Sequence, residues 1–495
     1  MGQLATGFET LKPLRAVDWW ACGKWQPATG KTRNMVTPID GRTQIGHVTL
    51  ASADDMAEAV RGACLVAPQA HALDVSTRQK ALLAMSEGLL DQKHELANLI
   101  TLENGCPTRQ SVALQVESAA GVLRTFADLC ETFEYEEERV AARGGRVIIQ
   151  KLPVGVAAGI VPWNVPLFLS AMKLGAAIAT GCPLILKPAP ETALSAHMLA
   201  RLVASLDLPV GMVSVLAGDR DAGAALVGDH RIAKVSFTGS TRGGLAVARA
   251  SAERFARVTL ELGGKSAAIL LDDVDISAIL PELRMAALQN NGQVCGAQSR
   301  ILVPRARFGE IAEALAADFA SLKLGDPRHL DTDIGPLASE AQRVAIQSAI
   351  DDAKASGAPL LAEGSRLVIH QAGLEQGAYV APTLFGPVDP SLPIACEEVF
   401  GPVTCLIAYD NEDHAIALSD ASPYGLSGSV WSPDNTRALT VARRLRTGTV
   451  GLNTKRILDF AAPFGGMRSS GLGRELGVEG LNAWLEMKTI LLPNA

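Results

Sequence analysis

Between residues 154 and 258, short apolar runs alternate with segments whose apolar residues recur at helical spacing. Strands are predicted over 154–161, 183–187, 213–216 and 233–237. Helices are predicted after 166, over 192–205, after 219 and from about 240. Strands that are apolar throughout and separated by helices are typical of a parallel sheet covered on both faces. We therefore predict an α/β fold with a Rossmann-like, doubly wound sheet, in which ligands bind at the carboxyl ends of the strands.

Unusual stretches follow three of these strands, namely Pro162-Trp163-Asn164, Lys187-Pro188 and Thr238-Gly239-Ser240. The glycine-rich turn from Gly239 to Gly244 opens a helix, so its N–H groups suit a phosphate, although it lacks the GxGxxG pattern. An ordinary strand-to-helix turn would account for these glycines equally well. Lys187 is placed to reach a ribose hydroxyl, or it is a surface lysine whose stem lies along apolar residues.

The flanking regions predict further elements. Residues 16–50 predict short strands and turns, and the apolar positions from Val112 to Phe133 step by three and four, which indicates one face of a long helix. The acidic cluster at 134–138 is interpreted as the solvated end of that helix, and 146–152 as an exposed strand available for pairing. A second α/β region is predicted from 258 onward.

Length and charge restrict the class of protein. A chain of 495 residues exceeds a single core, so two or three domains are expected. The formal net charge is −7 with no long basic run, which argues against nucleic-acid binding. The uncharged stretch 154–172 is long enough to span a membrane. Pro162, Asn164 and Pro166 interrupt it, so a buried strand followed by a buried helix is the better interpretation, and no membrane association is expected.

The eight cysteines form no CxxC pair and none lies near paired histidines, so no metal site is expected. Scattered thiols in a large chain favour a reducing compartment. The first residues show no apolar core or cleavage signature, so we expect a cytoplasmic protein.

Two chemically capable residues stand in glycine-rich turns. Glu261 opens Glu261-Leu262-Gly263-Gly264, and Cys295 lies in Gly292-Gln293-Val294-Cys295-Gly296. A thiolate is a nucleophile and a carboxylate can activate water. Alone, such a cysteine is more commonly a small buried hydrophobe and such a glutamate a surface residue, so the hypothesis of a site needs the other motifs.

Together, seven stretches resemble the NAD(P)-dependent aldehyde dehydrogenase superfamily, from about Trp19 to the C-terminus. They are PWNVP at 162–166, LKPAPET at 186–192, FTGS at 237–240, ELGGKS at 261–266, GQVCG at 292–296, EEVFGPV at 397–403, and PFGG with SGLGRE within 463–475. Their order and spacing match the family. One such motif would be weak evidence, whereas seven in register are specific.

The resemblance implies catalytic roles. Cys295 is the expected nucleophile that attacks an aldehyde, and Asn164 the side-chain donor of the oxyanion hole. Glu261 is the expected base that activates the water releasing a carboxylic acid from the thioester. An oriented, partly deprotonated water is needed for that step.

The resemblance also implies cofactor residues. Trp163 and Lys187 match positions along the adenosine and ribose, and Gly239, Ser240 and Gly244 belong to the pyrophosphate turn. Glu398 and Phe400 match residues that hold the nicotinamide ribose. Lys173 and Glu475 resemble a pair that carries protons away. The expected cofactor is NAD, with NADP left open because Pro190, followed by Glu191, stands where many NAD-preferring members have a glutamate.

The substrate stays open at this stage. Lys455 and Arg456 lie in the stretch that lines the substrate funnel in the family, so they either favour an aldehyde with a distal carboxylate or are ordinary surface charges. The alternatives to hydrolytic aldehyde oxidation are a CoA-acylating semialdehyde dehydrogenase, against which Glu261 argues, and a non-enzymatic member that keeps only the fold.

The expected organisation has three parts: a dinucleotide-binding domain, an α/β catalytic domain and a small β oligomerisation element. The division is 1–133 and 154–258 for dinucleotide binding, 134–153 for the arm, 259–470 for catalysis and 471–495 for a C-terminal return with a last strand near 487–492. The resemblance implies a homodimer or homotetramer.

Overall fold

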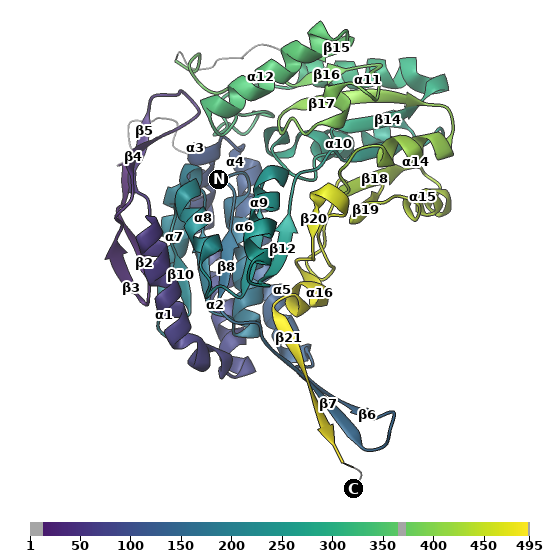
Figure 1. The fold of residues 1–495 in the computed structure, drawn as a ribbon. Coiled ribbons are helices and arrows are strands. Elements are labelled where there is room, and N and C mark those ends of the chain that lie inside the picture. Colours follow the sequence, from purple (N-terminus) through teal and green to yellow (C-terminus); the bar gives the residue numbers. More distant parts are fainter. Residues whose placement is uncertain (1–12, 365–372, 494–495) are drawn as a thin grey trace.

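A computed structural model describes residues 13–364 and 373–493 of the chain. Its largest sheet has eight strands in the order β20-β12-β11-β8-β9-β10-β2-β3 (Figure 1). The five central strands are parallel: β12 (Arg257–Glu261), β11 (Lys234–Thr238), β8 (Ala157–Ile160), β9 (Leu184–Lys187) and β10 (Val213–Val215). Antiparallel strands flank them: β2 (Asp18–Ala21) and β3 (Lys24–Pro27) at one edge and β20 (Gly471–Leu472) at the other. The predicted parallel sheet is confirmed.

Helices cover both faces of this sheet. One face packs against α6 (Pro166–Thr180) and α7 (Ala193–Ala204), the other against α1 (Ala53–His71), α8 (Arg220–Gly228) and α9 (Thr241–Ala252). Outside α6 lie α2 (Val75–Asp91) and α5 (Ser118–Thr132), and α3 (Lys93–Asn104) packs on α7. The short elements here are α4 (Thr108–Gln110), a π-helix (Ser111–Glu117), the 3₁₀ turn Pro190–Thr192 and α16 (Gly477–Asn482). The helices lie where the apolar spacing predicts them.

The helix predicted over 112–133 is confirmed with one irregularity. Its predicted apolar face is inside, since Val116, Leu123 and Phe126 are buried. However, the segment Ser111–Glu117 is a π-helix, which precedes the regular helix α5. Periodicity does not show such a turn because the spacing of the buried residues hardly changes.

A second sheet of seven strands begins after Glu261. Its order is β15 (Leu360–Glu363), β16 (Thr383–Phe385), β17 (Val403–Tyr409), β14 (Arg300–Pro304), β13 (Ala267–Leu270), β18 (Ser427–Trp431) and β19 (Thr449–Leu452). Its helices are α10 (Ile276–Leu288), α11 (Phe308–Ser321), α12 (Glu340–Ala355), α13 (Pro393–Cys396), α14 (Glu412–Asp420) and α15 (Asn435–Ala442), with 3₁₀ turns Gln289–Gly292, Arg305–Arg307 and Arg468–Ser470. The second α/β region was expected to start at residue 258. That residue lies inside β12, which pairs with β11 and so belongs to the first sheet.

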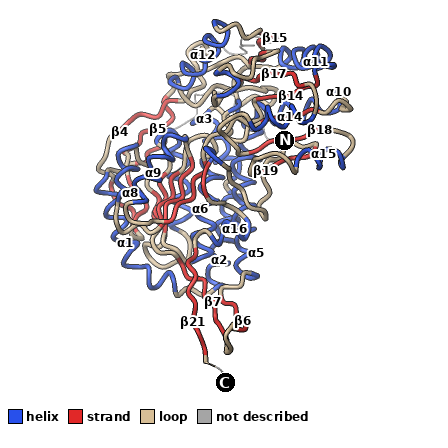
Figure 2. Tube along the Cα trace, turned by 45° about the vertical axis from the view of Figure 1, so that its right-hand side comes forward, coloured by secondary structure: helices blue, strands red, loops and turns tan. Residues whose placement is uncertain are grey.

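An arm of three strands extends away from both sheets (Figures 1 and 2). It consists of β6 (Glu136–Val140), β7 (Arg146–Pro153) and β21 (Leu485–Leu492), with β7 in the middle. The exposed strand predicted over 146–152 and its C-terminal partner are therefore confirmed. The helix end predicted for the acidic cluster is wrong: α5 ends at Thr132, and Glu136–Val140 pairs with β7.

A small sheet joins β1 (Leu14–Ala16), β5 (Gln44–Thr49) and β4 (Thr32–Val36) beside the first sheet. Among the described residues, no helix is both long and apolar enough to cross a membrane. The stretch 154–172 is instead the buried strand β8 followed by the start of α6.

Candidate functional site

Four predicted site stretches meet at one edge of the large sheet. Trp163 and Asn164 follow β8, Lys187 ends β9, Gly239 and Ser240 follow β11, and Glu261 ends β12. These strands are parallel and adjacent, so their carboxyl ends share an edge. The backbone N–H of Gly239 donates to the carbonyl of Glu261 at 3.0 Å, which fixes the two turns to each other.

A cavity of about 280 Å³ opens at this edge, and we call it the sheet-side cavity. Its walls include Trp163, Asn164, Gly239, Ser240, Glu261, Cys295, Glu398 and Phe400. The three predicted catalytic residues therefore lie in one cavity with five of the seven predicted cofactor residues. Lys187 and Gly244 are not in its walls.

A second cavity, of about 310 Å³, meets the first at Asn164, Leu169 and Cys295. We call it the loop-side cavity, because residues 455–460 form one wall. Its other walls are largely apolar and include Leu114, Val165, Phe168 and Val294. Cys295 thus stands between two separate spaces, each large enough for a molecule or part of one.

Strained backbone positions Cys295. Asn290, Asn291 and Gly292 all have positive φ, between 53° and 75°. The two asparagines are fully buried, and the Asn291 side chain donates to the carbonyls of Gly105 and Pro336 and accepts from Gly335 N–H. Such strain persists only where surrounding contacts hold it, and it is common at functional sites.

The electrostatic surroundings favour the neutral thiol in the free protein. Burial, together with the nearby carboxylates of Glu398 and Glu261, raises the pKa of Cys295 to about 12. A thiol becomes nucleophilic as thiolate, so a positive charge or a proton acceptor must arrive at Cys295 before it reacts.

Glu261 is 3 % exposed, and neither of its carboxylate oxygens has a hydrogen-bond partner among the described residues. Burial raises the pKa of Glu261 well above its usual range, with a further contribution from the charge of Glu475. A buried, unpartnered carboxyl is costly for stability, and a raised pKa is what a general base working near neutral pH requires.

Beneath Glu261 lies a buried ion pair. Lys173 Nζ donates to Glu475 Oε1 at 2.8 Å and also to the hydroxyls of Ser236 and Thr238, both at 2.9 Å. Ser236 Oγ donates to the same carboxylate oxygen at 2.6 Å. The structure therefore joins Lys173 and Glu475, the two residues predicted to move protons.

The sheet-side cavity has features that suit a dinucleotide. Ser240, a wall residue of this cavity, caps the twelve-residue helix α9, and its hydroxyl accepts from the backbone N–H of Gly243. A Cβ at Gly239 would come within 2.7 Å of the Phe237 ring, and one at Gly244 within 2.4 Å of Leu262, so both positions need glycine for packing. Because Gly244 has no side chain, α9 can pack close to the turn after β12.

Glu398 and Phe400 form another part of the wall of the sheet-side cavity. Glu398 Oε1 accepts from the backbone N–H of Gly264 at 2.9 Å, and burial raises the pKa of Glu398 to about 7. The rings of Trp163 and Phe400 meet edge to face at 5.6 Å, and Phe400 has a left-handed φ of 58°.

Lys187 is a buried lysine with an inward-facing head group. Its Nζ donates to the carbonyls of Pro188 and Gly218 at 3.1 and 2.8 Å, and burial lowers its pKa to about 8. Because it is 6 % exposed, the alternative of a surface lysine is wrong. The carboxylate of Glu191 lies near enough to raise the pKa of Lys187 in part.

The sequence gives no sign of several polar residues around Asn164. Asn104, Gln115 and Asn290 each donate a side-chain hydrogen bond to its backbone carbonyl. Only the adjacent Asn290-Asn291-Gly292 stretch is a usable signal, because asparagine and glycine together favour positive φ. Gln115 carries no such signal.

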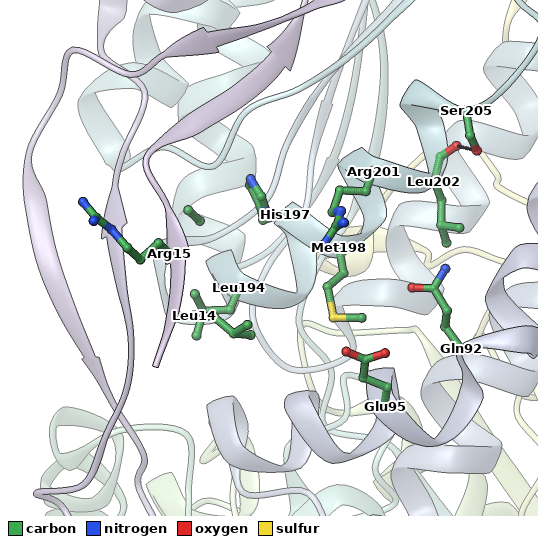
Figure 3. A pocket seen from close by; sticks show the side chains of 11 residues that line it. Leu14, Arg15, Gln92, Glu95, Leu194, His197, Met198, Arg201, Leu202 and Ser205 are labelled. Atoms are coloured by element: carbon green, nitrogen blue, oxygen red, sulfur yellow. Dashed lines mark hydrogen bonds between the residues drawn. The ribbon is translucent and has the colours of Figure 1, made fainter. Parts of the chain in front are cut away.

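Another hollow, of about 480 Å³, lies away from Cys295, between α3, α7 and β1 (Figure 3). Figure 3 shows the side chains of Arg201 and Glu95 turned toward each other with Met198 between them, while Arg15 points away. The walls of this hollow carry both basic residues, Arg15 and Arg201, and the acidic residue Glu95. The described residues contain no group of three His, Cys, Asp or Glu side chains that could hold a metal ion.

A doubly wound sheet with a cavity at its carboxyl edge is typical of dinucleotide-dependent oxidoreductases, and here a cysteine, an amide and a carboxyl line that cavity. The sequence model of the aldehyde dehydrogenase family matches residues 25–490. The chain belongs to the aldehyde dehydrogenase family and is an enzyme of that class.

Known relatives are similar over nearly their whole length. The chain is 38% identical over 474 residues to geranial dehydrogenase from Castellaniella defragrans, covering 95% of this chain and 97% of that one. It is 37% identical over 478 residues to a 3-succinoylsemialdehyde-pyridine dehydrogenase from a Pseudomonas species, covering 96% and 98%.

Solved structures agree with the fold. A mutant of aldehyde dehydrogenase C from Pseudomonas syringae, in complex with NAD+ and octanal, has a TM-score of 0.91 at 38% identity, covering 96% of each chain. An aldehyde dehydrogenase from Mycobacterium tuberculosis in complex with NAD+ has a TM-score of 0.93 at 37% identity, covering 97% of this chain and 99% of that one.

Proposed function

We propose that this protein oxidises an apolar aldehyde to its carboxylic acid with NAD+, through a thiohemiacetal and a thioester on Cys295. The single observation that carries the proposal is the place of Cys295, which lines both the sheet-side and the loop-side cavity. A nucleophile in that place holds its substrate in one space while a hydride leaves toward the other.

The sheet-side cavity is the proposed place of NAD+, which supplies, when bound, a hydride acceptor with a positively charged ring. Ser240 and the N-terminus of α9 would hold its phosphates, and Glu398, with Phe400, its nicotinamide end. Lys187 would lie near the adenosine end of the bound NAD+. The carboxylate of Glu191 is close to Lys187 and would repel a 2′-phosphate there, so we propose NAD+ rather than NADP+.

The reaction at Cys295 proceeds in two stages. The thiol first loses its proton to water in the cavity, which the positive charge of NAD+ would favour. Its sulfur then bonds to the aldehyde carbon, and the oxygen that becomes negative is stabilised by the Asn164 side chain and the backbone N–H of Cys295. Removing one such donor typically costs about 2.7–4 kcal/mol of barrier height. Loss of the hydride from carbon leaves a thioester on the sulfur.

Glu261 serves the second stage. As carboxylate it takes a proton from water, the hydroxide oxygen attacks the thioester carbon, and the carbon–sulfur bond breaks to release the acid. The proton can then pass from Glu261 toward the Lys173–Glu475 pair, which lies close enough for the Glu475 charge to raise the pKa of Glu261. A carboxyl held for water disfavours coenzyme A as the acyl acceptor.

The loop-side cavity supports an apolar substrate. Phe168 and Phe460 lie with ring centroids 6.2 Å apart, and Leu114, Ile457 and Leu458 add apolar surface. Lys455 Nζ lies 3.1 Å from Glu282, so its charge is already balanced, and Arg456 shares the mouth with Asp459. We therefore propose neutral aldehydes rather than carboxylate-bearing ones; octanal and geranial, named for two relatives, are of this kind.

A panel of aldehydes tests the function. NADH absorbance is followed with aliphatic, aromatic and carboxylate-bearing aldehydes, with NAD+ or NADP+, and with or without coenzyme A. The proposal expects the highest kcat/KM for a medium-chain aliphatic aldehyde with NAD+ and no effect of coenzyme A. Absence of NADH formation with every aldehyde would contradict it.

We also propose a cytoplasmic homodimer or homotetramer, with its parts divided as the sequence suggests. The arm supports assembly, because Val140, Met487 and Leu491 are 90%, 73% and 76% exposed on a sheet with open edges. All eight cysteines are free thiols, which fits a reducing compartment. Light scattering of the full chain, compared with a Met487→Lys and Leu491→Lys double variant, tests the assembly through a fall in mass.

A further inference from the structure

Three side-chain amides converge on one backbone oxygen at the site. The carbonyl of Asn164 accepts from Asn104 Nδ2 at 3.0 Å, Gln115 Nε2 at 3.1 Å and Asn290 Nδ2 at 3.0 Å. All four residues are buried. A carbonyl has two lone pairs, so three donors exceed what hydrogen-bond satisfaction requires.

The three amides come from separate parts of the chain. Asn104 is the last residue of α3, Gln115 lies in the π-helix Ser111–Glu117, and Asn290 has a left-handed φ of 53° before Cys295. Single π-helical turns occur mostly at functional sites, and left-handed non-glycine residues are strained. Two of the three amides are therefore presented by backbone that departs from regular geometry.

The side-chain amide of Asn290 also connects the Asn164 backbone with the turn that carries Cys295. Asn290 Nδ2 donates to the carbonyl of Gln293 at 3.3 Å as well as to that of Asn164. The side chain of Asn164 donates to the same Gln293 carbonyl at 2.9 Å. Asn290 thus fixes the Asn164 backbone relative to the turn that carries Cys295.

The arrangement leaves polar atoms unsatisfied. Gln115 Oε1 and Asn290 Oδ1 are buried and have no hydrogen-bond partner among the described residues. Unpaired buried acceptors lower stability, and each one in a folded protein calls for a reason. Stability alone would favour apolar residues at these positions, so a role in placing Asn164 explains them better.

We propose that Gln115 and Asn290 are positioning residues that hold Asn164 so that its side-chain amide meets the oxyanion formed at Cys295. This inference rests on the proposed oxyanion role of Asn164. In the free protein the Asn164 side-chain amide donates to the backbone carbonyl of Gln293 at 2.9 Å.

A double-mutant cycle tests the inference. Gln115→Met keeps the length of the side chain and removes its donors. We expect kcat to fall about 10- to 100-fold, since a misplacement of 1 Å can cost that much, with the KM for NAD+ unchanged. In an Asn164→Ala background the same substitution should cause no further loss, because the group it positions is gone.

Controls separate positioning from general loosening. Ser86→Ala removes another buried side-chain bond, from Ser86 Oγ to the Ala120 carbonyl, and should lower Tm without changing kcat. Asn290→Gly, which tolerates the positive φ, should repeat the effect of Gln115→Met and serves if that variant does not fold. Equal loss of kcat from Gln115→Met in both backgrounds would overturn the inference. Unchanged kcat in Asn164→Ala alone would instead overturn the oxyanion role itself.

Discussion

The two cavities that meet at Cys295 are built differently. The sheet-side cavity is formed by strand ends and turns that backbone N–H groups hold together. Gly239 N–H donates to the backbone carbonyl of Glu261, and Gly264 N–H donates to the side-chain carboxylate of Glu398. The loop-side cavity is formed by side chains, with Phe168 and Phe460 packed across it and residues 455–460 as a wall. A backbone N–H donates whatever its side chain is, so these hydrogen bonds are little affected by substitution, whereas side-chain walls can change with each substitution. We therefore propose that the chemistry resides in the sheet-side cavity and the choice of aldehyde in the loop-side cavity.

We expect the largest effect on activity at Cys295, where the two cavities meet. Cys295→Ala should lower kcat by about four orders of magnitude or more, because no other group in the cavities can form the thioester. NAD+ affinity, measured by quenching of tryptophan fluorescence, should stay within about two-fold. A large loss of NAD+ binding would mean that the cavities are not separate in function.

Glu261→Gln should affect only the release of the acid. We expect steady-state kcat to fall about 10²- to 10⁴-fold, while rapid mixing still shows one NADH formed per site, because the first stage needs no base at Glu261. A variant without this burst would place Glu261 in the first stage instead.

The pH profile offers a second measurement on the same residue. The pKa of Glu261 is raised above its usual range, and the base acts only when deprotonated. The rate of thioester hydrolysis should therefore rise as pH increases through that raised pKa and flatten above it. In Glu261→Gln the rise should disappear, and its persistence would assign the titration to another group.

On the loop side, Phe460→Ala should raise the KM for a medium-chain aldehyde about 10- to 100-fold, through loss of roughly 1.5–3 kcal/mol of apolar contact. The KM for NAD+ and the activity on acetaldehyde should change little, because neither reaches the Phe460 ring. Equal losses for short and long aldehydes would show that the two cavities do not act independently.

The smallest effect is expected at the mouth. Lys455→Ala should change kcat/KM less than about threefold, with equal effects on neutral and carboxylate-bearing aldehydes, because its half-exposed pair with Glu282 contributes at most about 1 kcal/mol. Arg456→Ala should behave in the same way. A selective loss with acidic aldehydes would support the carboxylate-binding hypothesis that the sequence left open.

Much of this site could be predicted from the order of residues. The strands of the parallel sheet are short and largely apolar, and each candidate residue ends or closely follows one of them, so Trp163, Lys187, Gly239 and Glu261 could be placed at one edge. Cys295 could not be placed that way, since it belongs to a turn before β14 in the other sheet. Its meeting with Asn164 was expected from the resemblance to a family, not from any local pattern.

Other features had no local signal. The acidic stretch at Glu136–Val140 has poor strand character and becomes a strand because β7 provides its hydrogen bonds. The charge of Lys455 looked available until the fold brought Glu282 beside it. The sequence alone determined most of the strands and helices, since apolar spacing is read over a few neighbouring residues. Tertiary structure alone decided which distant groups meet, such as the three amides on Asn164, because those contacts join segments up to 126 residues apart along the chain.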